Sequence, residues 1–152
     1  MRGRYAFVVF ALLLSQPAQA ICVPSLGVSA TELNFGVYDP GAASANTSMA
    51  TITLQCAVGL LPSFTVALSP GGSGSYAMRR MTNGSAVLSY NLYTDPNDTV
   101  VWGDGSGTTS TDSSSGLLSL GATSFTVYGS VPRGQYPAPG SFADAIMVTV
   151  TY

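Results

Sequence analysis

Apolar and polar residues alternate with a period of two in several short segments of this chain. Such alternation places one row of side chains in a core and the other row in water, as β-strands do. Turn sequences separate these segments, and no window keeps a helical period over three turns. The pattern predicts an all-β, two-sheet sandwich in one domain. The apolar rows are Leu33, Phe35 and Val37; Ile52, Leu54 and Cys56; Phe64, Val66 and Leu68; Leu88, Tyr90 and Leu92; Phe125 and Val127; and Ile146, Val148, Val150 and Tyr152.

The first twenty residues follow a different pattern. A short basic start, Met1 to Arg4, precedes an unbroken apolar run from Tyr5 to Leu14. Ala18-Gln19-Ala20 then matches the small-x-small cleavage site of secretory signal peptides. The apolar run is too short for a helix that crosses a bilayer, which needs about 20 residues. We therefore expect residues 1–20 to be a signal peptide, and residues 21–152 to be an exported domain without a membrane span.

The chain contains two cysteines, Cys22 and Cys56, and both remain after the predicted cleavage. Export places them in an oxidising compartment, where cysteines form disulfides. One bridge between them would stabilise the fold by on the order of 3–4 kcal/mol. The alternative, a reactive thiol pair, lacks the C-x-x-C spacing and a neighbouring His or Lys that would lower a thiol pKa.

Composition excludes several classes of function. Charged residues make up 8% of the chain, and there is no His. No Lys is present, because the five basic residues are all Arg. These absences exclude a His-based catalytic triad, a His-ligated metal site and a lysine Schiff base. They also leave too few cations to neutralise nucleic-acid phosphates. We therefore expect no enzyme, no cofactor, no metal site and no nucleic-acid partner.

The polar segment Gly103–Gly116 is the one stretch of low complexity in the chain. Its composition favours a flexible loop between two strands. Alternatively, Asp104 and Asp112 would offer carboxylates to Ca²⁺, although their spacing does not match the known calcium loop. Trp102 stands where this loop begins, and it is a candidate for an exposed sugar-binding platform. Packing in the core is the alternative role, because large rings usually bury most of their area.

The last predicted strand ends the chain with an alternating apolar row. Ile146, Val148, Val150 and Tyr152 belong to a strand that either pairs within its own sheet or forms an edge. An exposed alternating edge is an aggregation hazard unless another polypeptide covers it through main-chain hydrogen bonds. The row therefore predicts pairing with a partner strand as one of two roles.

Taken in order, the segments resemble the spore coat protein U domain, which is shared by pilus subunits of the archaic chaperone–usher class. No single segment is a specific motif, but the ordered set spans most of residues 22–152. The matching segments are Leu33-Asn34-Phe35-Gly36-Val37-Tyr38-Asp39-Pro40, Ile52-Thr53-Leu54-Gln55-Cys56, Phe64-Thr65-Val66-Ala67-Leu68-Ser69, Arg80-Met81, Leu88-Ser89-Tyr90-Asn91-Leu92-Tyr93-Thr94-Asp95, Val101-Trp102-Gly103-Asp104-Gly105, Val127-Tyr128-Gly129, Gly140-Ser141-Phe142-Ala143-Asp144 and Val148-Thr149-Val150-Thr151-Tyr152.

The resemblance implies an immunoglobulin-like sandwich that lacks one strand and has an apolar groove in its place. A periplasmic chaperone would fill the groove first, and an outer-membrane usher would then exchange it for a strand of a neighbouring fibre subunit. The last strand, with Ile146, Val148, Val150 and Tyr152, would border the groove. Only Ile21 would precede Cys22 after cleavage, so the subunit would accept a strand without donating one, as at a fibre tip or end. The alternative is a self-contained secreted adhesin or lectin-like module.

Overall fold

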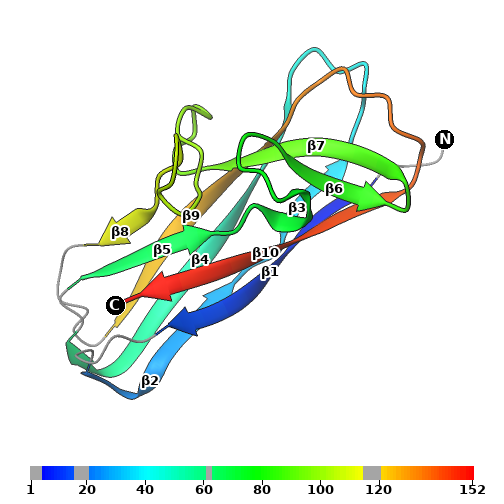
Figure 1. The fold of residues 1–152 in the computed structure, drawn as a ribbon. Coiled ribbons are helices and arrows are strands. Elements are labelled where there is room, and N and C mark those ends of the chain that lie inside the picture. Colours follow the sequence, from blue (N-terminus) through cyan, green and yellow to red (C-terminus); the bar gives the residue numbers. More distant parts are fainter. Residues whose placement is uncertain (1–4, 16–20, 61–62, 115–120) are drawn as a thin grey trace.

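The computed structural model describes residues 5–15, 21–60, 63–114 and 121–152, and most of these residues lie in β-strands (Figure 1). One short 3₁₀ turn, η1 (Gly71–Ser73), is the only helical element among them. The strands are β1 (Tyr5–Ser15), β2 (Ile21–Ala30), β3 (Leu33–Val37), β4 (Asn46–Leu60), β5 (Phe64–Leu68), β6 (Arg79–Asn83), β7 (Ala86–Tyr93), β8 (Asp112–Ser114), β9 (Gly121–Val131) and β10 (Ser141–Thr151).

The strands form two layers that share the core between them (Figure 1). One layer has the order β2-β4-β9-β7 and is antiparallel throughout. The other has the order β8-β5-β10-β1-β3, in which β1 and β10 are the parallel pair. The β6–β7 hairpin joins the layers at one side, because β6 also makes a single pairing with β10 at Thr82 and Ala143. The predicted all-β two-sheet sandwich is confirmed.

The predicted apolar rows supply the core. Except for Val37, Cys56 and Tyr152, their members lie between the layers with little or no exposed surface. Tyr152 is partly buried against the same core, and the Cys56 side chain lies outside the part that the structure describes. Phe64 and Trp102 both pack edge-on against Phe125, at centroid distances of 5.7 and 6.4 Å. The prediction was wrong for Val37, which is 57% exposed. Gly36 has a φ of +66°, so the period-two alternation of β3 stops there. The buried row members are Leu33, Phe35, Ile52, Leu54, Phe64, Val66, Leu68, Leu88, Tyr90, Leu92, Phe125, Val127, Ile146, Val148 and Val150.

Two polar loops next to Trp102 are ordered by their own hydrogen bonds. The Asp95 carboxylate accepts the backbone N–H groups of Asn97, Thr99 and Val100. In the following loop the Gly103 N–H donates to the Ser110 carbonyl at 2.8 Å, and the Asp104 carboxylate accepts the Ser106 N–H at 2.9 Å. The described part of the predicted flexible segment, residues 103–114, is therefore a closed loop followed by β8. Short polar side chains cap such turns well.

The two cysteines lie on neighbouring strands but not opposite each other. Cys22 on β2 pairs with Gly59 of β4, whereas Cys56 on β4 pairs with Leu26 of β2. At about 3.3 Å per residue, the cysteine backbones stand roughly 10 Å apart along the strands, beyond the span of a disulfide. Their side chains lie outside the part that the structure describes. The bridge therefore stays a prediction, and it requires another β2–β4 register.

Candidate assembly site

β10 divides its side chains between the core and the outer surface. Ile146, Val148 and Val150 are fully buried, and Tyr152 is partly buried against the same core. Met147, on the opposite face, is 37% exposed. The predicted apolar row thus faces the core over its whole length. Its predicted role in pairing with a partner strand depends on the edges of β10.

One edge of β10 is occupied by β5 and β6, and the other by β1. Val148 to Thr151 pair with β5 in antiparallel fashion. β1 covers the other edge completely: its eleven residues pair in parallel with Ser141 to Thr151, from Tyr5 opposite Ser141 to Ser15 opposite Thr151. Figure 1 shows β1 and β10 side by side with both arrowheads at the same end. Residues 5–15 therefore supply the strand that completes this edge.

The second edge of β1 is paired with β3. Residues 5–8 pair in antiparallel fashion with β3, with a register shift between Ala6 and Phe7. Among the described side chains of β1, Val8 is fully buried, Phe10 packs partly against the core and Leu12 is 43% exposed. We call the space between β3 and β10, which β1 fills, the β3–β10 slot. It is lined on the core side by the apolar row of β10.

The occupant of the slot is part of the predicted signal peptide. Sequence reasoning assigned residues 5–14 to export only and missed this strand, because a leader core and a buried strand both require an uninterrupted apolar run. The predicted cleavage site, residues 18–20, lies outside the described residues. The signal peptide therefore stays a prediction.

One carboxylate lies in the inward row of β10. The Asp144 carboxylate accepts the Tyr90 hydroxyl at 2.7 Å and the Gly72 N–H at 2.9 Å. These donors compensate for the loss of water around a half-buried charge. Burial, reinforced by the negative charge of Asp144, raises the pKa of Tyr90 well above its ordinary value. Tyr90 therefore stays protonated and keeps donating to Asp144. In β1, Val8 is the residue opposite Asp144.

Trp102 is not an exposed platform, and that interpretation was wrong. Its side chain is 0% exposed, and its indole N–H donates to the Val66 carbonyl at 2.9 Å. Burial of a large aromatic ring stabilises the fold when its polar N–H group has a hydrogen-bond acceptor in the core. The Trp102 carbonyl accepts a hydrogen bond from Nη2 of Arg79 at 2.7 Å, and Arg79 is also 0% exposed. Trp102 is thus a core residue that hydrogen-bonds to both Val66 and Arg79.

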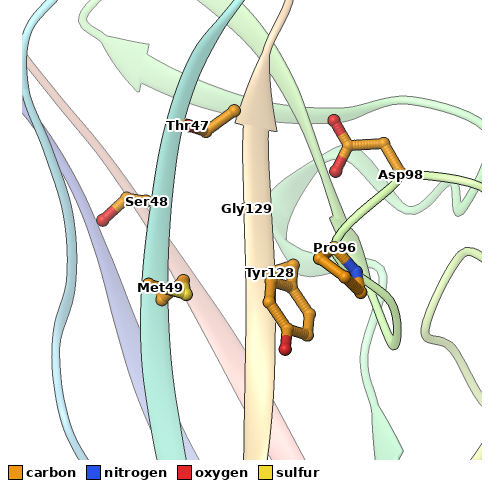
Figure 2. Close-up of a pocket in the computed structure, with 7 residues that line it drawn as sticks. All are labelled: Thr47, Ser48, Met49, Pro96, Asp98, Tyr128 and Gly129. Atoms are coloured by element: carbon orange, nitrogen blue, oxygen red, sulfur yellow. The ribbon is translucent and has the colours of Figure 1, made fainter.

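A shallow hollow lies on the outer face of the other layer (Figure 2). It measures about 230 Å³ and is lined by Thr47, Ser48 and Met49 of β4, Tyr128 and Gly129 of β9, and Pro96 and Asp98 of the Asp95-capped loop. The Ser48 hydroxyl points away from it and donates to the Asn34 carbonyl at 2.7 Å. Asp98 has a φ of +58°, which is rare for a residue other than glycine. The hollow therefore combines an aromatic ring, Tyr128, with a carboxylate, Asp98.

Within the described ranges, no group of three or more His, Cys, Asp or Glu side chains is placed to hold a metal ion. Asp104, one of the two residues considered for calcium, accepts the hydroxyl and the backbone N–H of Ser106. These bonds lower the pKa of the Asp104 carboxyl group.

The described ranges contain no helix with the length and apolarity needed to span a membrane.

Comparison with known proteins gives three findings. The model of the Spore Coat Protein U domain family matches residues 9–149. The chain is 33% identical over 147 residues to "Protein U" of Myxococcus xanthus, covering 86% of this chain and 77% of that protein. It also resembles a chain in the crystal structure of the CsuC–CsuE chaperone–tip adhesion subunit pre-assembly complex from archaic chaperone–usher Csu pili of Acinetobacter baumannii. That match has a TM-score of 0.55 and 15% identity, and it covers 84% of this chain but 40% of that one.

Proposed function

Because this chain belongs to the Spore Coat Protein U domain family, we propose that it is an exported subunit of a surface fibre or coat that assembles by strand complementation. The observation that carries this proposal is the β3–β10 slot. Its occupant, β1, is the apolar part of a predicted signal peptide. After cleavage behind Ala20, the domain would keep β3 and β10 but would lose the strand between them.

An empty slot would be costly for the domain. The edge of β10 that pairs with eleven residues of β1 would expose its main-chain N–H and C=O groups. The buried row Ile146, Val148 and Val150 would lose its neighbouring cover. Each apolar side chain that a new strand buries contributes about 1.5–3 kcal/mol. The mature domain therefore requires an extended apolar strand from a partner, which main-chain hydrogen bonds would hold in place.

The family resemblance supports particular partners for this step. A periplasmic chaperone would supply the strand first, and an outer-membrane usher would direct its replacement by a neighbouring fibre subunit. The protein would then pass through the periplasm to the cell surface. Its contribution would be folding energy released on assembly, and no catalysis, cofactor or metal is part of this proposal.

The use of β2 supports a position at a fibre tip or end. Residues 21–30 form β2 and pair with β4 from Ile21 opposite Leu60 to Ala30 opposite Ile52. In the predicted mature chain these residues are thus committed to their own sheet. The subunit would accept a strand but would have no free segment ahead of Cys22 to donate.

The test is to produce residues 21–152 in an oxidising periplasm with and without a co-expressed chaperone of an archaic chaperone–usher pilus. We expect aggregates alone and a soluble one-to-one complex with the chaperone. Val148→Asp, on the buried row, should abolish the complex. Met147→Asp, its exposed neighbour in sequence, should preserve it. A soluble monomer of residues 21–152 with one cooperative unfolding transition would contradict the proposal.

The alternative function, a self-contained lectin-like module, is supported by the hollow at Tyr128 rather than by Trp102. Its ring and the Asp98 carboxylate are the kinds of groups that contact the apolar face and the hydroxyls of a sugar. Screening of the full chain on a glycan array tests this alternative. Binding that is lost in Tyr128→Ala and retained in Tyr136→Ala, a change at an 80% exposed tyrosine elsewhere, would support it. No binding by the unaltered chain would reject it.

A further inference from the structure

We infer that residues 5–15 are the first occupant of the β3–β10 slot, so that the uncleaved chain is a closed, self-complemented domain and cleavage creates the form that needs a partner. This inference rests on the proposed function and deepens it by naming a segment of the same chain as the strand that precedes the chaperone. It assigns the predicted leader a structural role besides export.

The backbone pairing carries the first step. β1 pairs with β10 at eleven consecutive positions without a register shift. It also pairs with β3 at four positions on its other edge, from Tyr5 opposite Val37 to Val8 opposite Leu33. β1 thus covers the whole of this edge of β10 and also pairs with β3, and exposed strand edges are what make such a domain prone to aggregate. β1 therefore does what the proposed partner strand would do.

The side chains show that β1 fits tightly at one end and loosely at the other. Val8 is 0% exposed, whereas Leu12, four residues later on the same face, is 43% exposed. Phe10, between them, borders a hollow of about 270 Å³ that is also lined by Ala30, Thr31 and Glu32. β3 pairs with residues 5–8 of β1, and no strand of the described ranges pairs with the second half of β1 on that side.

This graded fit suits a temporary occupant. While β1 is joined to β2 through residues 16–20, it does not need to diffuse to the slot, so modest contacts suffice to hold it. Once the chain is cut behind Ala20, β1 is held in the slot only by its backbone pairing and by the contacts of its buried end at Val8. A longer or bulkier apolar strand that fills the hollow at Phe10 would then bind better than β1. Cleavage would thus convert a closed domain into an acceptor.

The test compares refolded full chains, residues 1–152, that carry Val8→Asp or Leu12→Asp. Both variants place a carboxylate in β1, but Val8 is buried opposite Asp144 and Leu12 is substantially exposed. Monomer yield and thermal unfolding are measured, with the fluorescence of the single tryptophan, Trp102, as the reporter of core packing. We expect the unaltered chain to be monomeric. Val8→Asp should lower Tm by roughly 10 °C or more or abolish the monomer, and Leu12→Asp should change it by less than about 3 °C.

A second measurement follows β1 after cutting. A site for a specific protease is placed within residues 16–20, and the refolded chain is cut and passed over a sizing column. Co-elution of the 1–15 fragment with the domain is expected, because no competing strand is present in this experiment to replace β1 in the slot. Equal effects of the two substitutions, or separation of the fragment from a domain that stays monomeric, would overturn the inference.

The outcomes also separate this inference from the proposed function. If residues 21–152 and the full chain aggregate to the same extent, the slot still requires a partner, but β1 does not fill it and the inference fails alone. If residues 21–152 form a stable monomer, the proposed function fails and the inference fails with it.

Discussion

Replacing Arg79 by Met is expected to lower the free energy of unfolding by about 3 kcal/mol, an order of magnitude set by the acceptors that lose their donor. Within the described ranges Arg79 is the one charged residue that is buried, with 0% exposure. Its guanidinium donates to the Ser69 carbonyl at 2.9 and 3.0 Å and to the Trp102 carbonyl at 2.7 Å. It also donates to the Asn91 side-chain oxygen at 2.7 Å. One side chain thus ties three separate segments together.

The magnitude follows from what each acceptor would keep. The Asn91 oxygen still accepts the Leu92 N–H at 3.0 Å, so its loss is partial. The carbonyls of Ser69 and Trp102 lose their Arg79 donor, and an unsatisfied buried acceptor costs about 1–3 kcal/mol. The variant regains some stability because Met carries no charge that has to be buried. Burial disfavours the charged form of Arg79, as the lowered pKa of this residue indicates. The sum leaves a net loss of about 2–4 kcal/mol.

The assay is urea unfolding of the full chain followed by Trp102 fluorescence, with Arg80→Met as the matched control. Arg80 is the adjacent residue and is exposed, so its replacement should change stability by less than about 0.5 kcal/mol. Arg79→Lys should recover little, because an ammonium group cannot reproduce the planar arrangement of donors. Equal stability of the Arg79→Met and Arg80→Met variants, or full stability of Arg79→Lys, would refute the reasoning.

Three further predictions concern turns and titration. Gly71→Ala should destabilise the domain by about 2 kcal/mol more than Gly74→Ala in urea unfolding: both glycines have positive φ, but an added Cβ at Gly71 would collide with Asp144 and one at Gly74 would meet open space. Tyr38→Phe should cost about 1–2 kcal/mol in the same assay, because the Tyr38 hydroxyl donates to the Pro132 carbonyl at 2.8 Å and accepts the Gln135 N–H at 2.9 Å. The pKa of Tyr90 is raised in the folded state, first by burial, so its contribution is complete below pH 10.0 and is lost as the pH rises further. The free energy of unfolding should therefore stay level from pH 8 to about pH 10 and fall from there to pH 11. Tyr90→Phe should reduce the slope of this fall; an unchanged slope would assign it to Tyr76 and Tyr93, whose pKa values are also raised.

Period-two alternation predicted the sandwich because each strand has one face in the core and one outside. Ile52, Val66 and Val148, each from a different row, are fully buried as the pattern requires. It failed locally at Val37, where a glycine with positive φ interrupts the alternation. Strand existence follows from local pattern, but the pairing of distant segments does not. The β2–β4 register, which decides whether Cys22 and Cys56 can meet, is therefore not readable from their spacing.

The sequence predicted the apolar row of the candidate site but not the position of Trp102 or Arg79. The row on β10 is recognisable because it alternates, and the structure buries it. Trp102 could not be placed, since its burial depends on the Val66 carbonyl from another strand as the partner of its indole N–H. The role of Arg79 could not be predicted from the sequence either. Its three acceptors come from residues 69, 91 and 102, and no sequence pattern brings these together.

The segment from Tyr5 to Leu14 shows why pattern alone cannot choose between two functions. A leader core needs an unbroken apolar run, and a strand enclosed by two neighbours and a core accepts one. The same residues satisfy both requirements, and the deciding information lies in β3 and β10, which leave a gap of one strand between them. Substitutions in this segment therefore test the two uses separately. Val8→Asp would impair folding of the uncleaved chain, whereas Leu12→Asp would test export with little effect on the fold, because Val8 is fully buried and Leu12 is 43% exposed.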